Sequence, residues 1–223
     1  MNIAIFGNGR MGKLISRLAI ERGHSIVVIS NSKQPATKCN LSNVDVAIDF
    51  SLPNVAFDNI SYAIKNETAI ISGTTNWLGR LEEVRNMCLE QKGAFLYASN
   101  FSLGMNIFFQ LNKKLAKLIK RGGYIGSIEE THHLNKLDSP SGTAISLYND
   151  LKDILMEEIP INSKRISDEI GTHKINYSSK IDDIEIIHRA KTRDGFALGA
   201  IIAAEWILDK KGVFSMQDLL KHN

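Results

Sequence analysis

The 223-residue sequence has few features of secreted, membrane or zinc-binding proteins. It contains two cysteines, Cys39 and Cys88, and no CxxC pair, so we expect neither a disulfide framework nor a metal site. The first residues lack a basic segment followed by a long apolar stretch, which argues against a signal peptide. The longest apolar candidate, 197–204, is far shorter than the ~20 residues of a membrane span. We therefore expect a cytoplasmic protein with no membrane partner.

The sequence also lacks a strong excess of charge of either sign. Its 27 Lys and Arg residues against 24 Asp and Glu residues give a formal net charge of +3. So small an excess argues against a nucleic-acid partner, and short basic runs such as Lys113-Lys114 are typical of solvated helix faces. A mildly basic balance nevertheless suits small anions such as phosphates and carboxylates.

The first half of the chain alternates short β-type runs with helical patterns. We expect strands at 2–6, 26–29, 44–50, 69–71 and 95–97, with helices from residue 11, from Pro53 and over 81–91. Strands that alternate with helices predict βαβ units and a parallel sheet.

The second half has a different pattern. Helices are expected at 105–120 and 142–158, strands at 124–133 and 184–188, and no element is assigned to the polar stretch 161–183. Strands grouped in this way predict an α+β domain over 102–189. The apolar helical segment 196–210 is expected to pack on the first domain, so we place the first domain at 1–101, completed by 190–223.

A glycine-rich loop opens the first helix directly after the first strand: Gly7-Asn8-Gly9-Arg10-Met11-Gly12. In this setting the first glycine permits a tight turn, the second admits a pyrophosphate, and the third brings helix and strand close together. The free N–H groups of the helix start then face the phosphates. A turn without a ligand would have the same letters, but the strand–loop–helix context favours a Rossmann-type dinucleotide-binding domain.

The end of the second expected strand bears on the choice of cofactor. Sites for NAD usually place an acidic residue there to bind the ribose 2′-OH. This chain has Ser30, Ser32 and Lys33 instead, which favours NADPH over NADH, unless Lys33 is simply a loop residue.

The most informative segment is 130–144. Two adjacent histidines, His132 and His133, precede Lys136, and the polar run Ser141-Gly142-Thr143 begins a helix. Ser141 is a good N-cap, and the N–H groups that follow it suit a carboxylate. Each feature alone has an ordinary structural explanation, but together in one loop of a nucleotide-binding protein they indicate an anion held beside an acid–base residue.

This segment resembles the signature E-x-H-H-x-x-K-x-D-A-P-S-G-T-A of the 4-hydroxy-tetrahydrodipicolinate reductase family, formerly called dihydrodipicolinate reductases. Ser139 replaces the alanine of the signature, and Asn76 replaces a glycine in another family motif. Further matching segments are Gly7 to Gly12, Asp49-Phe50-Ser51, Gly73-Thr74-Thr75, Ala98-Ser99-Asn100-Phe101-Ser102-Leu103-Gly104 and His188-Arg189-Ala190.

The resemblance implies a short form of an enzyme that reduces a small dicarboxylate imine with NADPH or NADH in lysine and diaminopimelate biosynthesis. It implies that 102–189 binds substrate and forms a homotetramer. It assigns His132 as the acid–base residue, Lys136 as the proton donor, and His133, Ser141, Gly142 and Thr143 as substrate contacts. It also places two further segments along the cofactor: Gly73, Thr74, Thr75, and Ala98, Ser99, Asn100, Phe101.

Two other interpretations stay open at the level of sequence. A different NAD(P)-dependent dehydrogenase, for instance one acting on an amino acid, would share the first domain but would not need the histidine pair with Lys136. A nucleotide-sensing protein without catalysis would be expected to have lost that lysine or one of the histidines. The lysine and both histidines are present.

Overall fold

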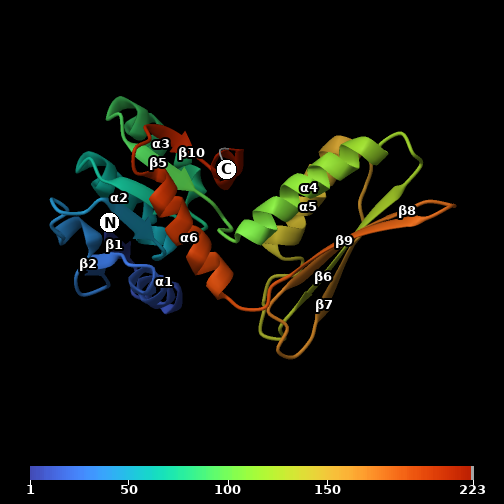
Figure 1. Cartoon of the computed structure of the whole chain (residues 1–223), viewed down its shortest axis with the longest axis horizontal. Helices are drawn as coiled ribbons and strands as arrows, with labels where there is room; N and C mark the ends of the chain where they lie inside the picture. The colour runs from blue at the N-terminus through green and yellow to red at the C-terminus, as the bar shows by residue number, and fades with distance from the viewer. Residues whose placement is uncertain (222–223) are drawn as a thin grey trace. The chain divides into compact units, whose positions relative to one another are not determined.

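The computed structural model describes residues 1–221, which form two compact units (Figure 1). One unit comprises Met1–Leu103 and the chain from Asp194 onward, and the other comprises Gly104–Arg193. Each unit has its own sheet and core, which confirms the expected α/β class. Residues 222–223, at the end of the segment 190–223 assigned to the first domain, lie outside the described residues.

The first unit is built on a six-stranded sheet in which every neighbouring pair is parallel. Its order is β10-β5-β4-β3-β1-β2. The strands are β1 (Asn2–Phe6), β2 (Ser25–Ser30), β3 (Val46–Asp49), β4 (Ala69–Ser72), β5 (Ala94–Tyr97) and β10 (Gly212–Phe214). The chain moves outward in opposite directions from β1 to β2 and from β3 to β4. The carboxyl ends of β1 and β3 therefore flank a crevice where open parallel sheets bind nucleotides.

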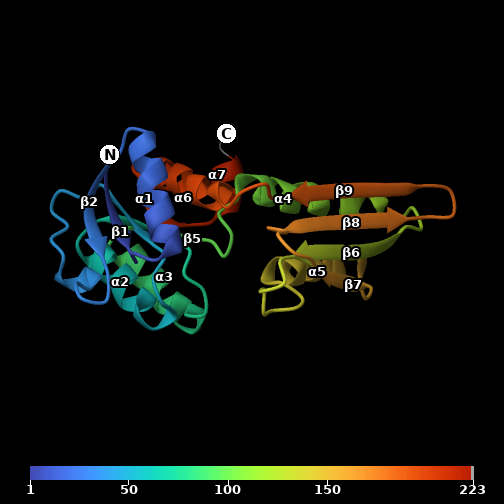
Figure 2. The ribbon, with the colours of Figure 1, turned by 90° about the horizontal axis from the view of Figure 1, so that it is seen from below.

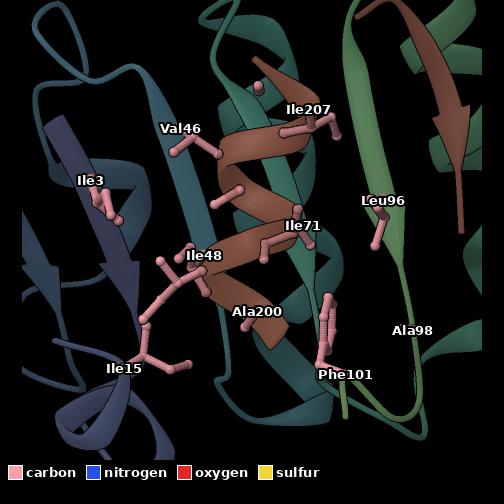
Figure 3. Close-up of a cluster of buried hydrophobic side chains, with 14 of the residues drawn as sticks. Ile3, Ile15, Val46, Ile48, Ile71, Leu96, Ala98, Phe101, Ala200 and Ile207 are labelled. Carbon is pink, nitrogen blue, oxygen red and sulfur yellow. The ribbon is translucent and has the colours of Figure 1, made fainter. Parts of the chain in front are cut away.

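Helices cover both faces of this sheet (Figure 2). Helices α1 (Arg10–Glu21) and α6 (Asp194–Ile207) pack on one face, and α2 (Pro53–Lys65) and α3 (Leu81–Glu90) pack on the other. Pro53 is the first residue of α2, where its missing N–H costs no helical bond. As expected, α6 packs on the first unit: Ala200 and Ile207 lie over Ile48 and Ile71 of the sheet (Figure 3).

The second unit is a four-stranded mixed sheet of order β7-β6-β8-β9. Its strands are β6 (Ile125–His132), β7 (Ile161–Arg165), β8 (Thr172–Ser178) and β9 (Asp183–Arg189), and its helices are α4 (Leu103–Ile119) and α5 (Gly142–Leu155). The two helices lie on one face (Figure 1). Alternate residues of β6 point toward them, which buries Ile128, Glu130 and His132 on the same side.

The sequence pattern missed β7, β8, β10 and the short C-terminal helix α7 (Met216–Lys221). Strands β7 and β8 were missed because they lie in the polar stretch 161–183. Each has polar residues on the face that the helices leave uncovered, and β7 also carries charged residues. β8 does alternate, with His173, Ile175 and Tyr177 buried, so a period of two was present in its sequence. No described helix has the length and apolarity needed to cross a membrane.

Candidate functional site

The glycine loop occupies the crevice between β1 and β3. Gly7 has φ of +105°, and a Cβ added there would lie 2.3 Å from the carbonyl oxygen of Phe50. A Cβ on Gly12 would lie 1.8 Å from the carbonyl oxygen of Gly7. A Cβ on Gly9 would meet nothing within 4 Å. The protein's own packing therefore requires Gly7 and Gly12, whereas Gly9 faces open space at the start of α1.

That space opens into a cavity of about 760 Å³ within the first unit. Its lining includes Gly7, Asn8 and Gly9, the strand end 30–32, and 50–52 after β3. The first turn of α1 contains no acidic residue, and Arg10 is exposed there. Met11 packs against the core instead of lining the cavity. Gly9 thus leaves the N-terminus of α1 uncovered by a side chain, next to a cavity of this size. This arrangement fits the phosphate groups of a dinucleotide.

Asp49 organises the neighbouring strand ends. Its carboxylate is fully buried and accepts hydrogen bonds from the hydroxyls of Ser51, Ser72 and Thr74 at 2.6, 2.9 and 2.7 Å. The Asn59 amide donates at 3.1 Å. Burial raises the pKa of Asp49, and the four hydrogen bonds only partly oppose it. The network fixes the ends of β3 and β4 beside the glycine loop.

This network limits what the segment 73–75 can offer a cofactor. The Thr74 hydroxyl donates to Asp49 and accepts the N–H of Ser51 at 2.9 Å, so its side chain is engaged inside the protein. A Cβ on Gly73 would lie 2.3 Å from the Phe50 ring. The Gly73 N–H donates to the Asp49 carbonyl at 2.9 Å, and the Thr74 carbonyl accepts from the Trp77 indole at 2.7 Å. Thr75 is exposed, so its side chain is the group available for a ligand.

The segment 98–101 divides in the same way. Ala98 and Phe101 are buried in the core, and a Cβ on Gly199 of α6 would lie 1.8 Å from the carbonyl oxygen of Phe101. Ser99 is exposed, and Asn100 accepts the N–H of Ser102 at 2.9 Å. Of the four expected cofactor residues, Ser99 and Asn100 therefore have side chains outside the core.

The end of β2 is only partly as expected. Ser30 is buried, and its hydroxyl accepts the N–H of Gly7 at 3.3 Å, so it supports the glycine loop. Asn31 and Ser32 line the cavity. Lys33 is exposed, is absent from the cavity lining, and donates its N–H to the Asn31 side chain at 2.9 Å.

The second unit brings the expected acid–base residues to the end of β6. His132 is buried, and its Nδ1 lies 3.3 Å from Oε2 of Glu130. Its Nε2 faces Gly171, where an added Cβ would lie 3.1 Å away. His133 is half-buried, and its Nε2 lies 3.3 Å from the Arg193 guanidinium.

Lys136 is paired with a carboxylate of its own loop. Its ammonium donates to both carboxylate oxygens of Asp138 at 2.7 and 2.9 Å. Lys136, and to a smaller extent the N–H of Gly142, hold the pKa of Asp138 below its ordinary value. The donors expected to bind a substrate carboxylate therefore already hold a carboxylate here.

Ser141 caps α5, as expected, but its polar atoms point inward. Its hydroxyl accepts the Ala144 N–H at 3.2 Å and lies 3.3 Å from Nε2 of His173. Its N–H donates to Glu130 at 3.1 Å. Gly142 is exposed and Thr143 is half-buried, so these two are the more accessible residues of the helix start.

Sequence reasoning overlooked Glu130, Asp138, His173 and Arg165 as parts of this site. Arg165 lies at the end of β7, in the stretch given no element, and donates to Glu130 at 3.2 Å and to the Asp138 carbonyl at 2.6 Å. Glu130 and Asp138 belong to the signature and were available from it. His173 could be placed only by pairing β8 with β6.

Comparison with known proteins agrees with the order of these features along the chain. The family model described as "Dihydrodipicolinate reductase, N-terminus" matches residues 1–101, and that described as "Dihydrodipicolinate reductase, C-terminus" matches residues 104–220. The 4-hydroxy-tetrahydrodipicolinate reductase of Christiangramia forsetii is 47% identical, covering 99% of this chain and 98% of the relative. That of Thermosipho africanus is 34% identical with the same coverage.

A solved structure shares the fold. The dipicolinate-bound dihydrodipicolinate reductase from Paenisporosarcina sp. TG-14 aligns with a TM-score of 0.81 at 19% identity, covering 96% of this chain and 97% of that one. Both family models together span nearly the whole sequence, in the order in which the two units occur. The chain therefore belongs to the dihydrodipicolinate reductase family.

Proposed function

We propose that the protein reduces 4-hydroxy-tetrahydrodipicolinate to tetrahydrodipicolinate, with loss of water, in lysine and diaminopimelate biosynthesis. One observation carries the proposal. The loop 130–144 places a buried histidine, a lysine that already holds a carboxylate, and a helix N-terminus in one unit, and the other unit has a dinucleotide cradle. An amino-acid dehydrogenase would need the cradle alone.

The substrate's two carboxylates suit the groups around the start of α5. We assign Gly142 and Thr143 to one carboxylate, with Lys136 and His133 supplying positive charge and donors beside it. Ser141 contributes by holding the helix start in place, since its own polar atoms bond inward. The carboxylate of Asp138 occupies the Lys136 ammonium in the structure and must give it up when a substrate carboxylate arrives.

Proton transfer falls to His132 and Lys136. Water leaves from the 4-position of the ring, and negative charge develops toward the ring nitrogen as the unsaturated ring is reduced. An ammonium at that nitrogen stabilises the charge and delivers the proton, which is the role of Lys136. Histidine suits the acid–base role because its ordinary pKa lies near neutral pH.

The reduced nicotinamide supplies the hydride when it is bound. For its phosphates we assign 7–12, in particular the backbone around Gly9, and along its length the exposed or backbone groups of 73–75 and 98–101. NADPH is favoured over NADH because no acid follows β2. The exposed Lys33 contributes only a screened charge, so we expect a preference of ~10-fold or less.

We further propose a homotetramer located in the cytoplasm. The face of the second sheet opposite α4 and α5 has a row of charges, in which Glu129 pairs with Lys164 at 2.9 Å and Lys174 pairs with Glu185. Such a face, complementary in charge to itself, suits a second copy of the chain. The two free, buried cysteines suit a reducing compartment.

The test is oxidation of NADPH and NADH in the presence of freshly generated substrate, followed at 340 nm. We expect substrate-dependent turnover with both cofactors. His132→Gln and Lys136→Ala should each lower kcat ~100- to 10,000-fold and leave cofactor affinity nearly unchanged. Full activity in both variants would refute the assigned roles. Light scattering should give the mass of four chains, and a monomer would refute the tetramer.

A further inference from the structure

Glu130 is a fully buried carboxylate to which the reaction as described gives no role. Burial acts to raise its pKa, but the polar groups around it, His132 and Ser141 foremost, outweigh burial and the net shift is downward. The side chain is therefore an anion inside the second unit. Buried anions are costly unless their surroundings compensate them, so the contacts of each oxygen are informative.

One carboxylate oxygen ties three elements together. Oε1 of Glu130, on β6, accepts the Ser141 N–H at the start of α5 at 3.1 Å. It also accepts from the Arg165 guanidinium, on β7, at 3.2 Å. The same guanidinium donates to the Asp138 carbonyl at 2.6 Å. Glu130 is thereby held in one place and fixes the helix start that we assign to the substrate carboxylate.

The other oxygen faces the proposed acid–base residue. Oε2 of Glu130 lies 3.3 Å from Nδ1 of His132, an ion-pair distance at which the N–H is not aligned for a hydrogen bond. Catalytic contacts of this kind often tighten only when substrate binds. The opposite nitrogen of the ring, Nε2, is directed toward Gly171. This residue has no side chain, and an added Cβ would lie 3.1 Å from Nε2.

His173 completes the surroundings of His132. The two rings meet edge to face with centroids 5.0 Å apart. Burial first, then the neighbouring His132, lowers the pKa of His173 to about 3, so it is neutral. The Ser141 hydroxyl accepts from Ala144 and can donate to Nε2 of His173. Glu130 is therefore the anion that faces His132, and as a carboxylate it can only accept a hydrogen bond.

We propose that Glu130 is a positioning residue, which keeps the proton of neutral His132 on Nδ1 and so presents Nε2 to the reacting proton. The inference rests on the acid–base role proposed for His132. A carboxylate that orients a catalytic imidazole in this way sets both its tautomer and its direction. Because the same carboxylate holds the Ser141 N–H, one side chain aligns the acid–base residue with the substrate's carboxylate site.

A metal ion is the competing account of these side chains, because one ligand atom each of Glu130, His132 and His173 lies within 4.8 Å of the others. The Arg165 guanidinium on the same carboxylate disfavours it, since a bound cation would face a fixed positive charge. Zinc titration of the protein distinguishes the two accounts. Stoichiometric zinc binding that His173→Gln abolishes would overturn the positioning role.

The decisive experiment is long-range ¹H–¹⁵N NMR of the histidine rings in the substrate-free protein, with His132→Gln used to assign the signal. We expect the Nδ1–H pattern for His132 in the wild type and a growing Nε2–H fraction in Glu130→Gln. In steady-state kinetics Glu130→Gln should lower kcat by about 10- to 100-fold with cofactor KM unchanged, and Glu130→Asp should recover part of the loss.

Glu157→Gln is the control. It removes the same charge from an exposed residue of the second unit that belongs neither to the site nor to the charged sheet face. We expect its kcat within about twofold of wild type. An Nε2–H pattern in the wild type refutes the proposal even if Glu130→Gln fails to fold, as does wild-type kcat in Glu130→Gln. If His132→Gln keeps full activity, the role assigned to His132 fails, while the NMR result still decides what Glu130 does to the ring.

Discussion

The buried His173 predicts that the second unit loses stability in mild acid. Burial, followed by the electrostatic effect of the neighbouring His132, lowers its pKa from 6.5 to about 3. The residue is only 4% exposed, so solvent screening is small. Below about pH 6.5 the unfolded chain binds a proton on this residue, whereas the folded chain does not bind one until the pH approaches 3. The free energy of unfolding therefore falls as the pH falls from about 6.5 toward 3.

The size of this effect follows from linkage. Each pH unit between the unfolded and folded pKa values removes up to ~1.4 kcal/mol. Between pH 7 and pH 5 a pKa that is 6.5 unfolded and about 3 folded corresponds to a loss of ~2 kcal/mol from His173 alone. His188, whose pKa burial also lowers, adds to the loss in the same direction.

The comparison is between the wild type and His173→Gln, whose side chain still offers the Ser141 hydroxyl an acceptor. Urea unfolding is measured at pH 7, 6 and 5 by far-ultraviolet circular dichroism, which reports both units. Fluorescence of Trp77 and Trp206 reports only the first unit, because both tryptophans lie there. The acid-sensitive transition should therefore appear in circular dichroism and be weaker in fluorescence.

Groups common to both proteins cancel in the difference between their pH profiles. We expect the wild type to lose ~2 kcal/mol more than His173→Gln between pH 7 and pH 5. The variant starts from lower stability at pH 7, because the packing of the imidazole is lost. Parallel pH profiles in the two proteins would show that His173 titrates normally and refute the reasoning.

Three further predictions concern the first unit. Gly9→Val should abolish NADPH binding in a fluorescence titration, because its side chain would fill the space assigned to the pyrophosphate. The circular dichroism spectrum should stay normal, because a Cβ there has no protein atom within 4 Å. Unchanged affinity would show that the phosphates do not bind at Gly9. Gly199→Ala should lower the stability seen by tryptophan fluorescence by several kcal/mol, since its Cβ would lie 1.8 Å from a carbonyl oxygen, whereas Gly195→Ala in the same helix, where the nearest atom is 3.9 Å away, should cost nothing measurable. Lys33→Ala should raise the KM for NADPH less than ~10-fold and leave that for NADH unchanged, and an equal shift in both would show that Lys33 does not meet a 2′-phosphate.

The sequence by itself determined the family, the alternation that builds the parallel sheet, and the two loops on which function depends. Local rules suffice for these features: continuous apolar strands, Pro53 at a helix start, the glycine spacing of 7–12 and the cap at Ser141 are all set by neighbours in the chain. They tell which residues belong to a loop. They do not tell which atoms in the loop are free.

The tertiary structure decided the availability of those atoms. Thr74 and Ser141 belong to the motifs, yet their hydroxyls bond inward to Asp49 and to the surroundings of Glu130, because residues distant in sequence converge there. His173 meets Glu130 only through the antiparallel pairing of β8 with β6. Burial and hydrogen-bond partners depend on such long-range pairing, and a single sequence does not encode them in any local pattern.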